Sequence, residues 1–195
     1  MTNLPPLTFF DLETTGLDPR KGHRIIEVAG VKIIDGIIRP EETFVSLVNP
    51  DRDIPWEARQ VNKISEEDVK SAPGIDIVLP QFLEFAKGTT LIAHNAAFDY
   101  GFLEVEKEYC WGYTDLPECL CSMKLSQALY PTEFRHSLDV ISKKFGLALP
   151  AERHRALADT LLAAEALLKM AEQGKIRTLE DLRKKAGLKQ LTKSK

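Results

Sequence analysis

Short apolar runs dominate the first quarter of the chain. Three of them predict β-strands at residues 6–12, 24–35 and 37–48, because each is rich in apolar and β-branched residues and is bounded by turn-forming residues. The Asp35-Gly36 pair between the second and third runs is typical of a two-residue hairpin turn. We therefore expect these three strands to form an antiparallel meander.

Helical spacing of apolar residues becomes common after residue 60. Ser65 and Asp68 form a capping box, which marks the start of a helix, and Thr178 and Asp181 repeat this pattern near the end of the chain. Two further strands are expected at residues 89–94 and 119–123, and helices at 74–87, 97–109, a segment ending near 130, 138–145 and 156–172. The order β-β-β-α-β-α-β-α with a helical tail predicts an α/β fold with a mixed five-stranded sheet flanked by helices.

Two of the expected helices have features that bear on their packing. Pro80 must kink the helix at residues 74–87 or delay its start, because proline cannot donate a backbone hydrogen bond. The helix at residues 97–109 has apolar side chains at positions i, i+4, i+7 and i+11. This spacing predicts a stripe facing the core, made of Phe98, Phe102, Val105 and Tyr109.

The composition is that of an ordinary globular protein. The 195 residues suit one domain with a sizeable core, and 44% of them are hydrophobic and 28% charged. The formal charge of −3 gives no overall basic signature, so a polyanion would have to meet a local patch or a metal ion. From Lys175 onward the charge is about +6. Such a tail can contact a phosphate backbone, although a solvated helix face is its more common meaning.

The cysteines and the hydropathy indicate a cytoplasmic setting. An odd count of three cysteines, with no signal peptide expected before Phe9, favours reduced thiols. Cys119 and Cys121 are too close together for the usual spacing of a zinc site. No apolar run approaches the length needed to cross a bilayer, so we expect no association with a membrane.

Two acidic residues, Asp11 and Glu13, end the first apolar run and are separated only by Leu12. Residues i and i+2 of a strand point to the same face, so the two carboxylates are expected roughly 6–7 Å apart at the Cα level. At an effective dielectric constant near 20, their repulsion is roughly 2–3 kcal/mol. Solvent, a proton or a cation must compensate for it.

Further candidates lie at two expected helix starts. Asp99 falls in the first turn of a helix that follows a strand, where α/β proteins commonly build sites. His154 and Asp159 are five residues apart, so on one continuous helix they would point about 140° apart. They can converge only if His154 lies on the preceding loop and Asp159 in the early helix.

Four carboxylates in one cleft would repel one another without hard divalent cations, and oxygen ligands suit Mg²⁺ or Mn²⁺. Two such ions about 4 Å apart support in-line phosphoryl transfer. A single histidine beside them is more useful as a base for the attacking water than as a ligand. Taken singly, each motif has a simpler reading: Asp99 as a first-turn acid, and His154 as an exposed loop residue. Their combination indicates a metal site.

Three segments carry a family resemblance: DLETTGLD at residues 11–18, HNAAFD at 94–99 and HRALAD at 154–159. They resemble the three exonuclease motifs of the DEDD superfamily in its histidine-containing branch, DEDDh. That branch includes the proofreading epsilon subunit of bacterial DNA polymerase III, ribonuclease T and oligoribonuclease. The likeness runs from about residue 6 to residue 170, so we expect an exonuclease domain at residues 1–173 and a short basic helical tail at 174–195.

The resemblance implies a ribonuclease H-like fold and metal-dependent 3′–5′ removal of nucleoside 5′-monophosphates. Asp11, Glu13, Asp99 and Asp159 would bind two Mg²⁺ or Mn²⁺ ions, and His154 would be the general base. Two segments would bind the terminal nucleotide, with Leu17 as an apolar wedge. Their residues are Thr14, Thr15, Gly16 and Leu17 in the first, and His94, Asn95 and Phe98 in the second.

The expected substrate is the 3′ end of single-stranded DNA, because the ETTGL segment resembles the DNA-directed branch; RNA is the alternative. Relatives close to the epsilon subunit often have V-H-G-I-[ST] where this chain has VNKIS at residues 61–65, a departure that concerns the positioning of the substrate. A DNA polymerase subunit is a candidate partner, although the chain contains no recognisable clamp-binding motif.

Two other function classes stay open. A catalytically silent nucleic-acid-binding module of the same fold would be expected to lack one of the acids or the histidine, and none is missing. An aspartic protease would need two D-[ST]-G elements, and the sequence contains none.

Overall fold

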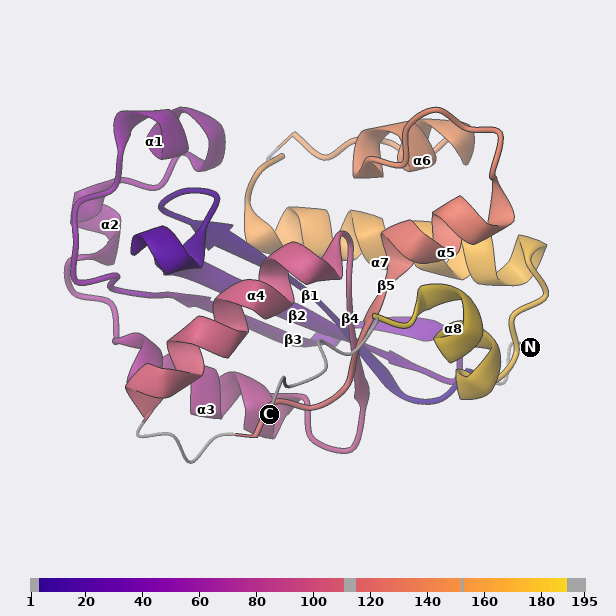
Figure 1. The fold of residues 1–195 in the computed structure, drawn as a ribbon, viewed down its shortest axis with the longest axis horizontal. Helices are drawn as coiled ribbons and strands as arrows, with labels where there is room; N and C mark the ends of the chain where they lie inside the picture. The colour runs from indigo at the N-terminus through magenta and orange to yellow at the C-terminus, as the bar shows by residue number, and fades with distance from the viewer. Residues whose placement is uncertain (1–3, 111–114, 152, 189–195) are drawn as a thin grey trace.

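The computed structural model of the protein describes residues 4–110, 115–151 and 153–188. Its sheet has the strand order β3-β2-β1-β4-β5, with helices on both faces (Figure 1). The β1–β2 and β2–β3 pairs are antiparallel, whereas β4 is parallel to β1 and β5 is parallel to β4. The strands are β1 (Leu7–Thr14), β2 (Ile25–Ile34), β3 (Ile37–Leu47), β4 (Thr90–Ala93) and β5 (Cys119–Cys121). The predicted mixed five-stranded sheet is confirmed.

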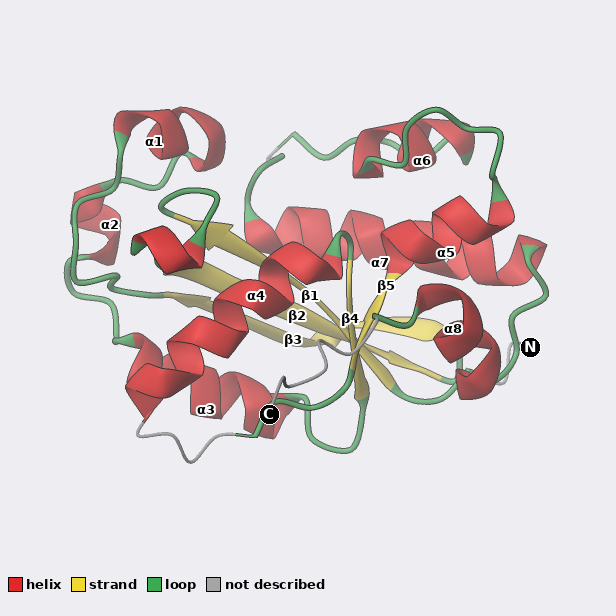
Figure 2. Cartoon of the chain, viewed as in Figure 1, coloured by secondary structure: helices red, strands yellow, loops and turns green. Residues whose placement is uncertain are grey.

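Helices lie on both faces of this sheet, and every connection between consecutive strands except that between β2 and β3 contains a helix (Figure 2). Two short 3₁₀-helices are η1 (Pro19–Lys21) and η2 (Lys107–Cys110). The α-helices are α1 (Trp56–Asn62), α2 (Glu66–Val69), α3 (Ile75–Phe85), α4 (Ala96–Glu106), α5 (Ser122–Leu129), α6 (Leu138–Lys144), α7 (Ala156–Gln173) and α8 (Leu179–Ala186). Both predicted capping boxes are present, at the starts of α2 and α8.

Alternate residues of β1 enter different cores. Leu7 and Phe9 pack in the cluster that includes the apolar face of α7, and Phe10 and Leu12 pack in the cluster that includes α3 and α4. All four side chains are buried. Because side chains alternate along a strand, the two acidic residues of β1 lie on the α7 side of the sheet, in line with Leu7 and Phe9.

The hairpin between β2 and β3 is confirmed, and the helix α1 is an element that the sequence did not predict. Asp35 and Gly36 have φ angles of 54° and 72°, as a two-residue turn of type I′ requires. Trp56 and Val61 of α1 are 63% and 52% exposed, and its N-cap, Pro55, makes no side-chain capping bond. The helix therefore has neither the apolar stripe nor the cap that would have revealed it.

The stripe predicted for the helix at 97–109 is wrong at its C-terminal end. Phe102 and Leu103 of α4 are buried, and so is Glu106. Tyr109 is 53% exposed, with the Arg24 guanidinium 4.0 Å from its ring centroid. The chain changes to 3₁₀ geometry after Glu106, so residues beyond it no longer follow the 3.6-residue period.

The two edge strands are irregular or short. In β3, the pairing steps from Thr43 opposite Val31 to Arg39 opposite Lys32, so residues 40–42 bulge out of the ladder. The other edge, β5, has three residues, and Leu120 forms an antiparallel bridge with Gly187.

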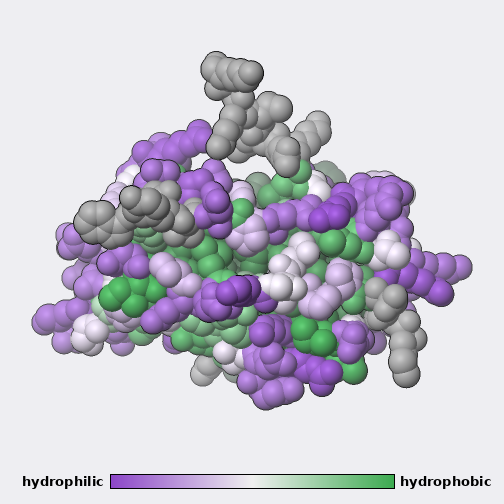
Figure 3. Space-filling view, turned by 90° about the horizontal axis from the view of Figure 1, so that it is seen from below, coloured by the Kyte–Doolittle hydropathy of each residue, from purple (hydrophilic) through white to green (hydrophobic). Residues whose placement is uncertain are grey.

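The helix α8 packs beside α5 and β5 (Figure 1), and its Leu182 and Ala186 are buried in the core. Residues 189–195 of the predicted basic tail lie outside the described residues, and the division of the chain at residue 173 stays a prediction. Hydrophilic side chains cover most of the face in Figure 3, with apolar ones in separate patches among them. Within the described residues, no helix is both long and apolar enough to cross a membrane.

Candidate active site

The site begins where β4 separates from β1. The two strands pair from Leu7 to Phe9, and beyond Phe9 the strand β1 is paired with β2 alone. Asp11 and Glu13 lie in this stretch, near the C-terminal end of β1. In α/β sheets, the crevice outside the carboxyl ends of strands is the usual place for a ligand.

A third acid reaches the pair from the helix on the same face of the sheet. Asp159 is the fourth residue of α7, which packs against β1 and β2. Carboxylate oxygens of Asp11, Glu13 and Asp159 all lie within 4.8 Å of one another. We call these three residues the acidic trio. Three carboxylates with converging oxygens are the donor set that hard divalent cations such as Mg²⁺ or Mn²⁺ prefer.

Asp99 borders the trio from the other side. It lies in the first turn of α4, directly after β4, and is 2% exposed. Burial raises the pKa of its carboxylate, and the nearby backbone N–H groups of Asp99 itself and of Leu12 oppose that rise. The Asp99 charge in turn lies close enough to raise the pKa of Asp11.

Burial and mutual repulsion raise the pKa values of these acids. Burial raises the pKa of Asp11 well above its ordinary value, and the charges of Asp99 and Glu13 add to the effect. The pKa of Glu13 rises to about 8, chiefly through burial and then through the charges of Glu27 and Asp99. Burial also raises the pKa of Asp99 to about 8. Near neutral pH the cluster therefore favours a bound proton or cation.

This electrostatic arrangement predicts a pH-dependent stability of the metal-free protein. A folded-state pKa of about 8, against about 4 when unfolded, means that the folded chain holds protons that the unfolded chain has released. The free energy of unfolding must then fall as the pH rises from about 4 to about 8. In EDTA we expect a lower melting temperature at pH 8 than at pH 5, and a smaller decline in Asp11→Asn.

Thermal unfolding at the two pH values, with and without Mg²⁺, measures this effect. The matched control is Asp53→Asn, because Asp53 is exposed and its removal should leave the decline unchanged. An equal decline in Asp11→Asn and in the parent would show that the cluster does not repel itself.

His154 lies on the loop before α7, as its spacing from Asp159 required. It has a left-handed backbone conformation, with φ of 64°, and its side chain is exposed. Its backbone N–H donates to the Asp159 carboxylate over 3.2 Å. The loop therefore brings the imidazole-bearing residue beside the trio, at the solvent side of the site.

An arginine that the sequence analysis did not single out lies in the same loop. The Arg153 guanidinium forms an ion pair with Asp159 and a second with Asp139, the latter at 2.6 Å. Its positive charge opposes the rise in the pKa values of Asp11 and Glu13. Arg153 therefore partly neutralises the site.

The first predicted substrate segment forms a tight loop after β1. The Thr14 hydroxyl donates to the Gly16 carbonyl over 2.7 Å, and the Thr15 hydroxyl accepts from the backbone N–H of Arg24 over 2.9 Å. A Cβ on Gly16 would lie 2.3 Å from the His23 ring, so this close approach requires glycine. Leu17, at the tip, is 84% exposed, as an apolar wedge would need to be.

The unpredicted helix α1 supports this loop. Asn62, its last residue, is 2% exposed and donates from Nδ2 to the Thr14 carbonyl over 3.4 Å. Its Oδ1 accepts from the backbone N–H of Ile64 over 3.0 Å. The residue that departs from the V-H-G-I-[ST] pattern thus still contacts the substrate segment.

The second predicted segment follows β4. His94 donates from Nε2 to the His136 carbonyl over 2.9 Å, and its Nδ1 lies 3.0 Å from the Ser122 hydroxyl. Burial lowers the pKa of His94 to about 4, so its ring is neutral near pH 7. Asn95 is exposed with φ of 64°, and the Phe98 ring lies 5.1 Å from that of Phe102. His136 is half-buried and belongs to this network, with its Nδ1 2.8 Å from the Ser126 hydroxyl.

The structure thus gathers the acidic trio, Asp99 and His154 at one end of the sheet, with both substrate segments after strands that end there. Sequence reasoning missed three charged residues, Arg153 and the buried Glu27 and Glu106. A signal for Glu27 was available, since it is a single charge inside the apolar run IIEVAGV.

Comparison with known proteins agrees with this geometry. Residues 8–168 match the model of the exonuclease family RNase_T. The chain is 41% identical over 181 residues to a DNA polymerase III subunit epsilon-like protein of Rhodobacter capsulatus, which covers 91% of this chain but 26% of that protein. It is 36% identical over 160 residues to the DNA polymerase III subunit epsilon of Rickettsia typhi, which covers 80% of this chain and 69% of that protein.

Solved structures show the same fold. Exonuclease X in complex with 5′ overhanging duplex DNA has a TM-score of 0.73 and 31% identity, with coverage of 90% of this chain and 96% of that one. The nuclease domain of 3′hExo, a DEDDh family member bound to rAMP, has a TM-score of 0.76 at 20% identity, with coverage of 87% and 93%. The chain therefore belongs to the exonuclease family, and it has the fold of the DEDDh 3′-exonucleases.

Proposed function

We propose that this protein is a metal-dependent exonuclease that removes nucleoside 5′-monophosphates from the 3′ end of single-stranded DNA. The observation that carries the proposal is the acidic trio, whose oxygens converge within 4.8 Å beside an exposed histidine. Exonucleases of this family use divalent metal ions, and the trio suits them. The names of the relatives and the bound DNA of exonuclease X support DNA as the substrate.

Each residue has a proposed role. Asp11, Glu13, Asp99 and Asp159 would hold two divalent cations, Mg²⁺ or Mn²⁺, which would supply positive charge to the attacking oxygen of water and to the leaving oxygen of the phosphodiester. His154 accepts a proton from the attacking water, and its exposed position allows the proton to pass to solvent. Asp99 and Asp159 are buried, whereas Asp11 and Glu13 are half-buried and remain accessible to water.

The two substrate segments are proposed to hold the terminal nucleotide. Thr14, Thr15 and Gly16 offer backbone and hydroxyl groups on one side, and Leu17 separates the last base from the one before it. On the other side, His94, Asn95 and Phe98 line the pocket. The neutral ring of His94, fixed by two hydrogen bonds, would contact the nucleotide without adding charge.

Association with a DNA polymerase is a further part of the proposal. Two of the relatives above are named as DNA polymerase III epsilon or epsilon-like subunits. This chain spans about a quarter of the Rhodobacter capsulatus protein, so that protein contains long segments without a counterpart here. A proofreading role would follow if the chain binds a polymerase, and co-purification with that polymerase tests it.

A single assay tests the proposed reaction. Single-stranded DNA, single-stranded RNA and duplex DNA with a recessed 3′ end, each labelled at the 5′ end, are incubated with Mg²⁺, with Mn²⁺ or with EDTA. We expect single-nucleotide shortening of DNA with either metal and no products in EDTA. Shortening of RNA alone would assign the protein to the exoribonucleases. Internal cuts, or products in EDTA, would contradict the proposal.

A further inference from the structure

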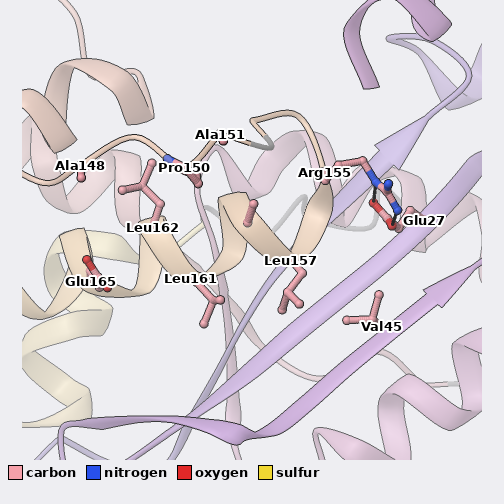
Figure 4. A pocket seen from close by; sticks show the side chains of 11 residues that line it. Glu27, Val45, Ala148, Pro150, Ala151, Arg155, Leu157, Leu161, Leu162 and Glu165 are labelled. Atoms are coloured by element: carbon pink, nitrogen blue, oxygen red, sulfur yellow. Dashed lines mark hydrogen bonds and ion pairs between the residues drawn. The ribbon is translucent and has the colours of Figure 1, made fainter. Parts of the chain in front are cut away.

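Two glutamates outside the acidic trio are buried and share one bonding pattern. Glu27, on β2, is 1% exposed. Its carboxylate accepts two hydrogen bonds from the Arg155 guanidinium, at 2.6 and 3.2 Å, and one from the backbone N–H of Ala156, at 2.9 Å. Figure 4 shows Arg155 extending from the start of α7 to Glu27 at one end of the groove between α7 and β3.

Glu106, at the end of α4, repeats this arrangement. It is 1% exposed and accepts three hydrogen bonds from the Arg24 guanidinium, at 2.9, 2.9 and 3.1 Å. The backbone N–H of Ile25 donates a fourth, at 3.1 Å. Each glutamate therefore binds an arginine side chain together with the backbone N–H of the next residue.

In both cases the arginine and the residue after it lie at the start of a helix or strand that follows a loop of the site. Arg155 is the N-cap of α7 and directly follows His154, and Ala156 is the first residue of the helix, three residues before Asp159. Arg24 directly precedes β2 and Ile25 is its first residue, after the loop that contains the first substrate segment. The backbone N–H of Arg24 donates a hydrogen bond to the Thr15 hydroxyl, which joins that loop to the arginine bound by Glu106.

An ion pair with a buried glutamate is weak as a source of stability, because the cost of desolvating the charge offsets much of the attraction. Its bidentate geometry instead fixes the orientation of the two side chains relative to each other, because the planar guanidinium and the carboxylate form two parallel hydrogen bonds in one arrangement only. Apolar side chains of similar size would cover the same positions without this directional effect. The repeated pattern therefore indicates a role in geometry.

We propose that Glu27 and Glu106 are positioning residues for the two sides of the active site. Glu27 fixes the start of α7, and thereby His154 and Asp159. Glu106 fixes the loop with the first substrate segment, and thereby the grip on the terminal nucleotide. This inference rests on the proposed function, and it assigns different kinetic consequences to two glutamates of equal burial.

The test compares three glutamine variants of the full chain. Glu27→Gln and Glu106→Gln each remove one buried charge. The matched control is Glu118→Gln, because Glu118 forms an equally bidentate pair with Arg183 on the surface, before β5. Steady-state kinetics on single-stranded DNA with Mg²⁺ give kcat and KM, and calorimetry with Mn²⁺ gives the metal affinity without turnover of a substrate.

We expect Glu27→Gln to lower kcat and to weaken Mn²⁺ binding, each by about tenfold, with KM little changed, because loss of a partner that orients a ligand typically has this effect. Glu106→Gln should raise KM by about fivefold or more and leave kcat and Mn²⁺ affinity unchanged, because it acts on substrate binding. The Glu118→Gln control should match the parent in all three quantities.

A purely structural role makes a different prediction. In that case Glu27→Gln and Glu106→Gln both have a lower melting temperature, while kcat, KM and Mn²⁺ affinity of the folded protein equal those of the parent. That result overturns the proposal, and so does the same kinetic defect in both variants. If a glutamine variant does not fold, Arg155→Lys and Arg24→Lys keep the charge and lose the fork, and they should show the same division of effects. If the parent cuts no nucleic acid, the proposed function fails, while Mn²⁺ affinity still tests Glu27.

Discussion

Replacing Asp11 with alanine should abolish nuclease activity while leaving the protein folded. The carboxylate is one of three whose oxygens converge within 4.8 Å, so its removal takes one ligand from the proposed metal site. A two-metal site contributes several kcal/mol to the transition state, so we expect the rate to fall far below a tenth of that of the parent, to about a thousandth or less. Quantifying shortened 5′-labelled DNA over time with saturating Mg²⁺ measures this loss.

The fold of Asp11→Ala should survive because the substitution removes charge repulsion. Burial and then the neighbouring carboxylates raise the pKa of Asp11, so the charged form destabilises the metal-free protein. In EDTA at pH 8 the variant should melt at or above the temperature of the parent. Asp53→Ala, at an exposed position, serves as the control and should keep full activity. More than about a tenth of the parent rate in Asp11→Ala would contradict the metal assignment.

Replacing His154 should slow turnover by about 10²–10⁴-fold, the usual contribution of a general base, and should spare metal binding. With saturating Mg²⁺ at each pH, the rate of the parent should rise with pH, because a general base acts only in its unprotonated form. This increase of the rate with pH should be absent from the variant. A variant that keeps both the rate and the pH profile of the parent would exclude His154 as the base.

The choice of substitution matters at this position. His154 has a left-handed backbone with φ of 64°, which alanine adopts less readily than asparagine. His154→Asn therefore removes the base with less backbone strain, and His154→Ala serves as the comparison. Equal activity losses in the two variants would assign the effect to the imidazole, whereas a loss in alanine alone would assign it to the loop.

The strands and the four acids could be predicted because their signals are local. Alternation over a few residues, one Asp-Gly turn and two capping boxes mark the elements, and Asp11 and Glu13 follow directly from the period of a strand. The position of His154 on a loop followed from the angle between residues five apart on a helix. These inferences needed no knowledge of distant contacts.

The residues that support the site could not be predicted in this way. Glu27 and Arg155 are 128 positions apart in the sequence, and Arg24 and Glu106 are 82 apart. Burying a charged side chain costs free energy unless a partner of opposite charge lies beside it. The sequence alone does not say which arginine is that partner. The same applies to α1, whose position depends on contacts such as that of Asn62 with Thr14.

The irregular edges of the sheet limit how a partner protein can be recruited. Many proteins bind a partner by β-augmentation, in which an extended peptide adds a strand to an open edge. In β3, Pro40 lacks a donor and residues 40–42 bulge out of line, and in β5 the bridge between Leu120 and Gly187 already occupies part of a three-residue edge. Within the described residues, neither edge offers a long regular row of backbone groups. A polymerase that contacts the described part of the chain would therefore meet chiefly side chains on the helices and loops, a surface that point mutations can readily alter.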